Sequence, residues 1–245
     1  MKLSLLIITA FLSLTLAPTW SAEPANPPPV PLKSDSKEWR FYPAAREAGK
    51  ARVLLIGDSI MNAYRHRVSA ALKNRATVDV WLTPITIKSP ELYDDLRTVL
   101  EQGPYDVVHF NIGLHEWMKG YIPEGQYEPL LRAYVKTIQA HAGHATLIWA
   151  STTQMTVKGQ PTALDPDNNP RIVERNGIAA RVMQEVGITV NDLYTLMGDK
   201  LALGKGDKYH WTPEGSAVHA DAVTASIGAA LEKRSPASTT ISAPR

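Results

Sequence analysis

Short apolar runs alternate with longer segments of helical pattern from about residue 51 to residue 234. The run 51–57, "ARVLLIG", is almost continuously apolar, which is typical of a strand covered on both faces. Strands that alternate with helices pair in parallel, and the helices pack on both faces of the sheet. The pattern therefore predicts an α/β domain with a parallel sheet. The predicted strands are 51–57, 76–83, 105–113, 145–152 and 188–192.

The segments between these strands carry helix start and stop signals. The segment 89–103 begins with Ser-Pro and ends at a glycine, and the segment 212–234 begins with Thr-Pro-Glu. In parallel α/β folds the functional groups gather beyond the carboxyl ends of the strands. This rule places Ser59, Gly113 and the loop 152–169 at one edge of the sheet. The predicted helices are 60–74, 89–103, 127–143, 170–187 and 212–234.

The predicted loop 152–169 is long for a connection in an α/β domain. Long loops without structure of their own are often functional, for example as a wall or a lid of a substrate site. A simple insertion would have the same sequence pattern, so both interpretations stay open at this point.

The first 22 residues have the composition of a secretory signal peptide. Lys2 precedes an apolar stretch from Leu3 to Leu16, and small residues follow at Ser21 and Ala22. The stretch is shorter than the roughly 20 apolar residues of a spanning helix, which favours cleavage over retention as an anchor. We therefore expect a secreted or periplasmic protein without stable membrane insertion.

Polar segments flank the predicted domain, which spans residues 41–233. Residues 23–40 are rich in proline and predict a linker, and residues 234–245 predict a disordered tail. The chain has no cysteine, so the exported domain would be held together by its core without disulfides.

Composition and charge exclude several classes of function. Lys and Arg are scattered and the net charge is only +2, so the sequence predicts no nucleic-acid partner. It contains no phosphate loop and no dinucleotide-binding fingerprint. The seven histidines show no metal-ligand spacing and there is no cysteine, so we expect neither a metal nor another cofactor.

The first predicted strand ends in Gly57, Asp58 and Ser59, directly before a predicted helix. A serine at this point projects its hydroxyl from the strand edge toward the helix N-terminus. The helix dipole and the free N–H groups there favour a developing negative charge. Taken alone, the stretch favours an ordinary helix cap, because Gly-Asp-Ser is short and common.

Asp207 and His210 lie three residues apart in "GDKYHWTPEG", just before the last predicted helix. At this spacing the carboxylate can reach one ring nitrogen of the histidine. The other ring nitrogen is then free to take a proton from a serine. Taken alone, this pair also fits a capping aspartate beside a surface histidine.

Together the two blocks resemble the SGNH (GDSL) hydrolase family, and the resemblance covers about Ala51 to Lys233. It implies a flavodoxin-like three-layer α/β/α sandwich with a parallel sheet of about five strands. Members of the family are esterases, lipases and carbohydrate O-acetylesterases. The resemblance makes Ser59 the nucleophile, His210 the general base and acid, and Asp207 the partner that orients the histidine.

The third block of the family, Gly-x-Asn-Asp, is altered in this chain. Gly113 matches, but His115 stands where the family has the asparagine that donates to the oxyanion. A neutral imidazole still offers one N–H donor, so His115 can keep the role. Asn111, two residues before Gly113, is a second candidate donor if the strand extends that far.

The second block is weaker still. The family has a glycine after the second strand, whose backbone N–H joins the oxyanion hole. This chain has no glycine between Gly57 and Gly103, and the loop 83–90 takes the place. The second backbone donor stays open, whereas the Ser59 N–H remains available.

These features predict an exported serine esterase that removes acetyl or other short acyl groups from carbohydrate. Acyl transfer to a glycan hydroxyl with the same residues is one alternative. A non-catalytic glycan-binding domain on a decayed hydrolase fold is another, although the intact Ser, Asp and His argue against it. Trp117 and Trp211 each follow a site block and could stack on sugar rings, but buried packing is the usual role of tryptophan.

Overall fold

The computed structural model describes residues 31–33, 35–36, 39–116 and 121–234. The predicted signal peptide, most of the predicted linker, and the tail after Arg234 lie outside the described residues, as does Trp117. Within the described part of the chain, no helix has the length and apolar character needed to cross a membrane.

Six strands form the central sheet, in the order β1-β3-β2-β4-β5-β8. The five strands from β3 to β8 are parallel and follow the order of flavodoxin-like folds, which confirms the predicted fold class. The strand β1 pairs antiparallel with β3 at one edge and was not predicted, because two residues are too few for a periodic pattern. The strands are β1 (Phe41–Tyr42), β2 (Ala51–Gly57), β3 (Ala76–Leu82), β4 (Val107–Phe110), β5 (Thr146–Ala150) and β8 (Thr189–Asn191).

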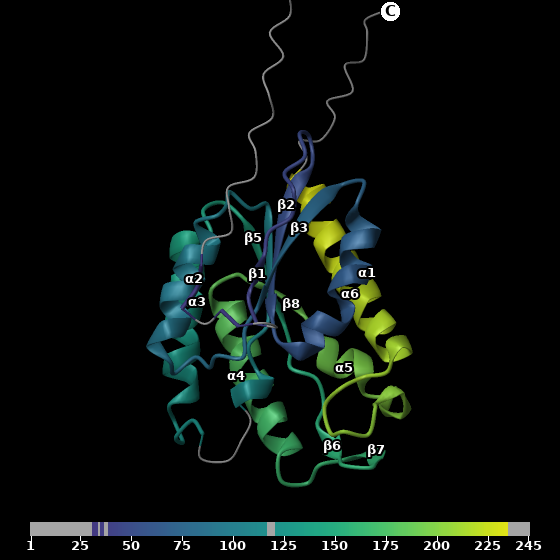
Figure 1. Cartoon of the computed structure of the whole chain (residues 1–245). Helices are drawn as coiled ribbons and strands as arrows, with labels where there is room; N and C mark the ends of the chain where they lie inside the picture. The colour runs from purple at the N-terminus through teal and green to yellow at the C-terminus, as the bar shows by residue number, and fades with distance from the viewer. Residues whose placement is uncertain (1–30, 34, 37–38, 117–120, 235–245) are drawn as a thin grey trace, which may run out of the picture.

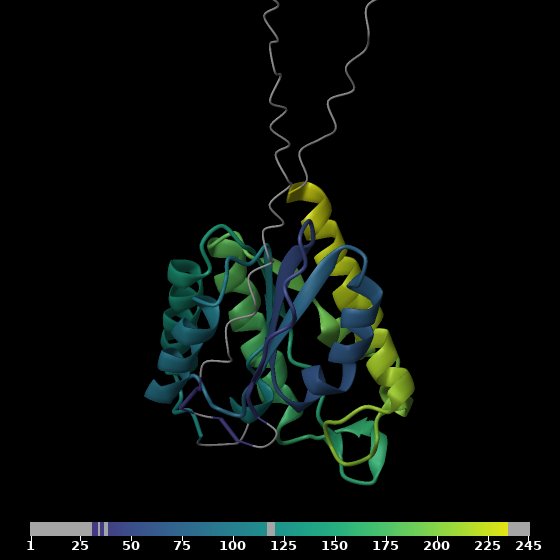
Figure 2. The same cartoon turned by 45° about the horizontal axis from the view of Figure 1, so that its top comes forward.

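Helices cover both faces of this sheet, as Figure 1 and Figure 2 show. On one face lie α2 (Pro90–Leu100), α3 (Tyr127–His141) and α4 (Asn169–Glu185). On the other face lie α1 (Ser59–Leu72) and α6 (Pro213–Arg234), with the short α5 (Leu193–Met197) nearby. The result is the three-layer sandwich that the alternation of strands and helices predicts.

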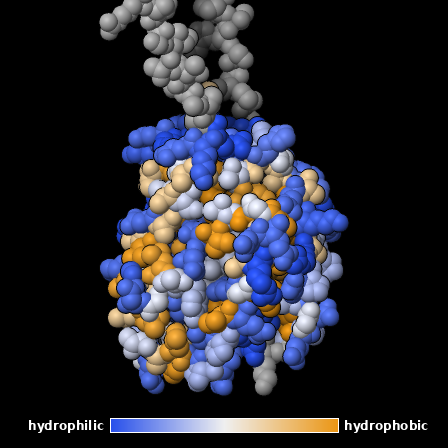
Figure 3. All heavy atoms as spheres, turned by 180° about the vertical axis from the view of Figure 1, so that it is seen from behind, coloured by the Kyte–Doolittle hydropathy of each residue, from blue (hydrophilic) through white to orange (hydrophobic). Residues whose placement is uncertain are grey.

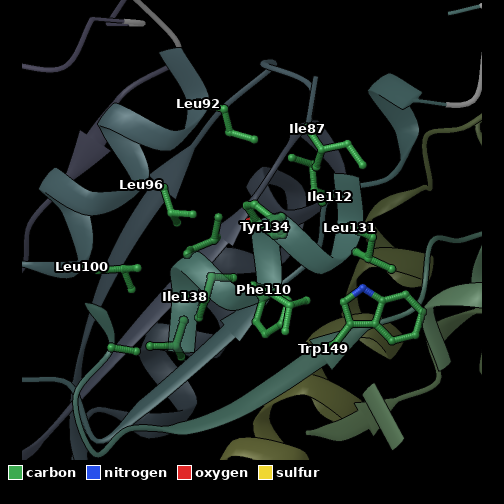
Figure 4. Close-up of a cluster of buried hydrophobic side chains, with 14 of the residues drawn as sticks. Ile87, Leu92, Leu96, Leu100, Phe110, Ile112, Leu131, Tyr134, Ile138 and Trp149 are labelled. Atoms are coloured by element: carbon green, nitrogen blue, oxygen red, sulfur yellow. The ribbon is translucent and has the colours of Figure 1, made fainter. Parts of the chain in front are cut away.

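Alternate residues of β2 enter two separate cores. Leu54 and Ile56 pack toward α2 and α3, whereas Val53 and Leu55 pack toward α1 and α6. All four side chains are at most 1% exposed, which explains why the run 51–57 is continuously apolar. Figure 4 shows the first of these cores, where Phe110 and Trp149 of the sheet meet the helices. Labelled members are Ile87, Leu92, Leu96, Leu100, Phe110, Ile112, Leu131, Tyr134, Ile138 and Trp149.

The segment 152–169 has structure of its own, contrary to the expectation of a plain loop. It forms an antiparallel hairpin of β6 (Thr156–Val157) and β7 (Gln160–Leu164). Gly159 in the turn has a φ of +79°, a conformation that favours glycine. In Figure 1 and Figure 2 the hairpin lies beside the loop that precedes α6.

The described end of the predicted linker packs on the domain. Leu32 is only 8% exposed and belongs to the first core. The Lys33 N–H donates to Asp95 Oδ1 of α2 over 2.8 Å. The composition of this segment is that of a linker. One buried apolar side chain and one hydrogen bond nevertheless hold it against the domain.

The opposite side of the molecule, seen in Figure 3, presents polar and apolar side chains interspersed over the surface. Among the described residues, the large apolar side chains that are well exposed are Leu164, Val173 and Val190. They lie on three different elements, β7, α4 and β8, and isolated exposed apolar residues of this kind are normal on soluble domains.

Candidate active site

Ser59 is the first residue of α1, at the carboxyl end of β2. The helix cap is Asp58, whose Oδ1 accepts the Ile60 N–H over 2.9 Å. Gly57 lets the end of β2 pack closely against α1, because a Cβ there would lie 2.8 Å from Met61 Cβ. Since Asp58 serves as the cap, the Ser59 hydroxyl is left for another partner.

That partner is His210, which lies 151 residues further along the chain. His210 Nε2 is 2.9 Å from Ser59 Oγ, and its Nδ1 is 2.8 Å from Asp207 Oδ2. The other carboxylate oxygen, Asp207 Oδ1, accepts the backbone N–H groups of His210 and Tyr209 over 2.9 and 3.3 Å. The fold thus brings the three residues into the order Ser, His, Asp that proton transfer from the hydroxyl requires.

The surroundings of Asp207 favour its ionised form. Partial burial acts to raise its pKa, but the hydrogen bonds from the backbone and ring of His210, and the charge of that ring, lower the pKa overall. A carboxylate that stays ionised can hold the Nδ1–H tautomer of the histidine and stabilise its protonated form.

The hairpin β6–β7 holds the loop that carries these two residues. Lys208, between them, has a φ of +103°, which is unusual for a residue other than glycine. Its carbonyl oxygen accepts the N–H and the Oγ1–H of Thr156 over 2.8 and 3.2 Å. A further bond joins the Gly159 N–H to the Gly206 carbonyl over 2.8 Å. Through these hydrogen bonds, the segment 152–169 holds the backbone of the loop that carries His210.

Gly113 is required by close packing against Thr152, two residues beyond the end of β5. A Cβ at this position would lie 1.7 Å from Thr152 Oγ1, so no other residue fits without a rearrangement. The 3-10 turn Leu114–Glu116 follows and carries His115. His115 is half-buried and lines the same cavity as Ser59 and His210.

Asn111 lies just beyond the end of β4, which stops at Phe110, so the predicted strand 105–113 is too long at this end. Its Nδ2 donates to the Ala150 carbonyl over 2.7 Å and to Thr152 Oγ1 over 3.3 Å. A side-chain amide has two N–H groups, and these contacts engage both. Asn111 ties the ends of β4 and β5 together, and we do not propose it as an oxyanion donor.

A cavity of about 370 Å³ opens at Ser59 and His210. Three aromatic side chains form part of its wall, of which sequence reasoning missed Trp39 and Tyr121 completely. The only signal for Trp39 was a large aromatic residue at the end of a proline-rich segment. The lining residues are Trp39, Ser59, Pro84, Thr86, Leu114, His115, Tyr121, Tyr209 and His210.

A second cavity, of about 320 Å³, also borders Ser59 and His210. Asn62 and Lys205 are among the residues that line it. Trp211 also borders it but is only 4% exposed, and its Nε1–H donates to Thr153 Oγ1 over 3.3 Å. Trp211 is therefore mainly a packing residue.

The loop after β3, where the family has its glycine, is fixed by the third block. The Ile87 N–H donates to Glu116 Oε1 over 2.6 Å, and the Glu116 side chain is fully buried. Thr86, the residue before Ile87, lines the cavity at Ser59. Within the described part of the chain, no three His, Asp or Glu side chains converge as metal ligands would.

Known proteins resemble this chain in sequence pattern and in fold. The model of the GDSL-like Lipase/Acylhydrolase family matches residues 55–218. No curated protein sequence matches the chain. Solved structures with a similar fold include a variant of an acetyl xylan esterase from Geobacillus stearothermophilus, with 18% identity and a TM-score of 0.58 over 74% of this chain and 96% of that one. They also include a carbohydrate acetylesterase from Sinorhizobium meliloti, with 15% identity and a TM-score of 0.58 over 74% and 99% of the two chains. A lipase/acylhydrolase from Enterococcus faecalis matches with 17% identity and a TM-score of 0.58 over 73% and 96%.

Proposed function

Because the chain belongs to the GDSL-like lipase/acylhydrolase family, it is a carboxylic ester hydrolase, and we propose that Ser59 is its nucleophile. The observation that carries this proposal is the hydrogen-bonded series from Ser59 through His210 to Asp207 at the carboxyl edge of the sheet. We further propose that the protein is exported and removes acetyl or other short acyl groups from carbohydrate.

In the acylation step, Ser59 Oγ attacks the ester carbonyl while His210 Nε2 takes the hydroxyl proton. Asp207 accepts the Nδ1–H and stabilises the imidazolium that forms. The carbonyl carbon becomes tetrahedral, and its oxygen becomes an oxyanion. When the carbon–oxygen bond to the alcohol breaks, His210 gives its proton to the departing alkoxide, and an acyl-serine remains.

In the second step, water replaces the alcohol. His210 takes a proton from the water as its oxygen attacks the acyl carbon. Collapse of the second tetrahedral intermediate releases the carboxylic acid, and His210 returns the proton to Ser59 Oγ. No cofactor is needed for either step.

Two groups support the oxyanion in this proposal. The Ser59 N–H belongs to the first turn of α1, where the helix dipole favours negative charge. His115 supplies a side-chain N–H in place of the family's asparagine. Loss of one such donor typically lowers kcat by about 10²- to 10³-fold, so the His115 position is important for the rate.

Acylated carbohydrate is the proposed substrate class for two reasons. Structural neighbours are described as an acetyl xylan esterase and a carbohydrate acetylesterase. The cavity at Ser59 is also lined by the aromatic residues Trp39, Tyr121 and Tyr209, and aromatic side chains can stack on sugar rings. The N-terminal sequence, with Lys2 followed by an apolar stretch, supports export.

Acyl transfer is the second candidate. The cavity of about 320 Å³ on the far side of Ser59 and His210 has room for an acceptor alcohol in place of water. Product analysis with and without an added glycan acceptor distinguishes the two reactions. A transferase yields acylated acceptor, whereas a hydrolase yields the free acid in both cases.

The test of the nucleophile is hydrolysis of p-nitrophenyl acetate by the full chain beside Ser59→Ala. Removal of the nucleophile should lower the rate by several powers of ten. Ser69→Ala, on the same helix but more than two turns away, is the matched control and should keep the wild-type rate. A Ser59→Ala rate equal to that of the wild type would exclude Ser59 as the nucleophile.

A further inference from the structure

The segment before β1 brings Trp39 to the cavity and fixes its backbone there. The Ser36 N–H donates to the Trp39 carbonyl over 2.9 Å, and the Trp39 N–H donates to Ser36 Oγ over 3.3 Å. One residue later, the Arg40 carbonyl accepts the Leu82 N–H at the end of β3 over 3.1 Å. Trp39 is thus held on both sides by hydrogen bonds.

The Trp39 ring contacts the ring of His115. Their centroids are 5.7 Å apart and their planes are perpendicular, which is a favourable edge-to-face arrangement. Both side chains line the cavity at Ser59. Among the described residues, no hydrogen bond to a ring nitrogen of His115 accompanies this contact. Trp39 is therefore a described group that can restrict the orientation of the imidazole.

An imidazole needs such a contact more than an asparagine does. Two side-chain torsion angles set the donor direction in both residues, but a neutral imidazole has only one N–H group, whereas an asparagine amide has two. His115 lies on the single 3-10 turn Leu114–Glu116 and is half-buried. A ring packed perpendicular to the imidazole restricts both torsion angles.

We propose that Trp39 is a positioning residue, which holds the His115 imidazole so that its N–H faces the oxyanion formed at Ser59. The proposal rests on the proposed function, in which His115 is an oxyanion donor. It assigns a role in catalysis to a segment that precedes the first strand of the domain.

A double-mutant cycle on the full chain tests this coupling. The variants are Trp39→Ala, Trp39→Phe, His115→Asn and the double variant Trp39→Ala/His115→Asn, with p-nitrophenyl acetate as the substrate. Trp39→Ala should lower kcat roughly two- to tenfold, as expected for loss of one aromatic contact, and should change KM little because this substrate is small. Trp39→Phe keeps an aromatic ring and should recover most of the rate.

The second arm of the cycle separates positioning from substrate contact. In the His115→Asn background, which carries the amide donor of the family, Trp39→Ala should no longer lower kcat. The His115 ring-proton resonance should also move in Trp39→Ala and Trp39→Phe, because the indole ring current is lost. This chemical shift can be measured whether or not a variant is active. A melting curve for each variant shows that the variant is folded.

If the rate depends on Ser59, either of two results would overturn the Trp39 proposal alone. An equal loss of kcat in both backgrounds would mean that Trp39 acts without His115. A higher KM with unchanged kcat would mean that Trp39 only contacts substrate. If Ser59→Ala kept the wild-type rate, the proposed function would fail, and the role of Trp39 with it. A serine-dependent rate without coupling would remove the Trp39 proposal alone.

Discussion

The carboxyl groups around Ser59 differ in pKa because their surroundings differ. Asp207 is partly exposed and accepts three hydrogen bonds, and its pKa is lowered. Glu116 is fully buried, and burial raises its pKa to about 7, although the Ile87 N–H opposes the rise. Burial likewise raises the pKa of Asp58. Asp207 is therefore the carboxylate suited to stabilise a protonated histidine, and Glu116 is suited to join two loops.

Gly113→Ala should be strongly destabilising. The added Cβ would overlap Thr152 Oγ1, and Thr152 cannot yield easily because Asn176 bonds both its N–H and its carbonyl. We expect a loss of about 1 to 3 kcal/mol or more in the free energy of unfolding, measured by denaturant titration. The esterase rate should also fall, because His115 lies two residues away.

The control for this change is Gly177→Ala on α4. A Cβ there would meet no atom within 4 Å, and the position is exposed within a helix. Alanine should stabilise the helix by roughly 0.8 to 1 kcal/mol. Equal stability of the two variants would show that Thr152 moves aside and that Gly113 is not required by packing.

At the scale of elements, the hairpin β6–β7 and the loop 204–212 form one unit. An isolated β-bridge joins Gly204 to Trp211, and the Lys205 N–H donates to the His210 carbonyl over 2.9 Å. The hairpin holds this loop in place through hydrogen bonds. Thr156 donates to the Lys208 carbonyl, and the Gly159 N–H donates to the Gly206 carbonyl. An unusual backbone conformation such as that of Lys208 persists only where its neighbours hold it in place.

Thr156→Val tests whether the hairpin positions His210. The change keeps the size of the side chain and removes the hydroxyl bond to the Lys208 carbonyl. One such bond contributes about 0.5 to 1.5 kcal/mol, so kcat for p-nitrophenyl acetate should fall about two- to tenfold if the whole bond energy serves to position His210. Thr162→Val, at an exposed site of the same hairpin, should leave kcat unchanged. A loss of stability without any loss of kcat would show that the hairpin stabilises the fold but does not position the histidine.

At the scale of the whole molecule, two buried histidines should make the fold sensitive to acid. His109 of β4 and His219 of α6 are each 1% exposed, and burial lowers the pKa of each from 6.5 to about 4. The unfolded chain therefore binds protons between these two pH values where the folded chain does not. The free energy of unfolding should fall as the pH drops from 6.5 to 4, by on the order of 3 kcal/mol for each histidine.

Glu116 contributes to this pH dependence with the opposite sign. Its pKa is about 7 in the folded chain and near 4.5 when unfolded, so its contribution is present below pH 4.5 and is lost as the pH rises to 7. Two histidines outweigh this one carboxyl group in the range where both effects act. We therefore expect a net rise in stability up to about pH 6.5.

Denaturant titrations between pH 4.5 and 7.5 measure this dependence. His219→Leu should remove most of the net slope on the acid side, because the one remaining buried imidazole is then opposed by Glu116. His66→Leu is the control, since an exposed imidazole on α1 is hydrated in the folded and the unfolded chain alike. A slope that His219→Leu leaves unchanged would contradict this account of acid sensitivity.

The sequence by itself determined the five parallel strands and the two site blocks. Burial on both faces makes a central strand continuously apolar, so the run 51–57 reveals its place in the sheet without reference to any other segment. The pairing of Asp207 with His210 could likewise be predicted, because it depends on a spacing of three residues within one loop. The blocks also indicated the family to which the chain belongs.

Only the tertiary structure decided how the distant segments meet. Trp39 was assigned to a linker, yet its ring lies against His115, and the predicted loop 152–169 supports the loop of His210. Asn111 has the right residue type for an oxyanion donor, but contacts with β5 engage its amide. Such contacts join residues from about 40 to more than 70 positions apart, so they cannot be predicted from the composition of either segment. They depend on how the layers pack, and packing is a property of the whole chain.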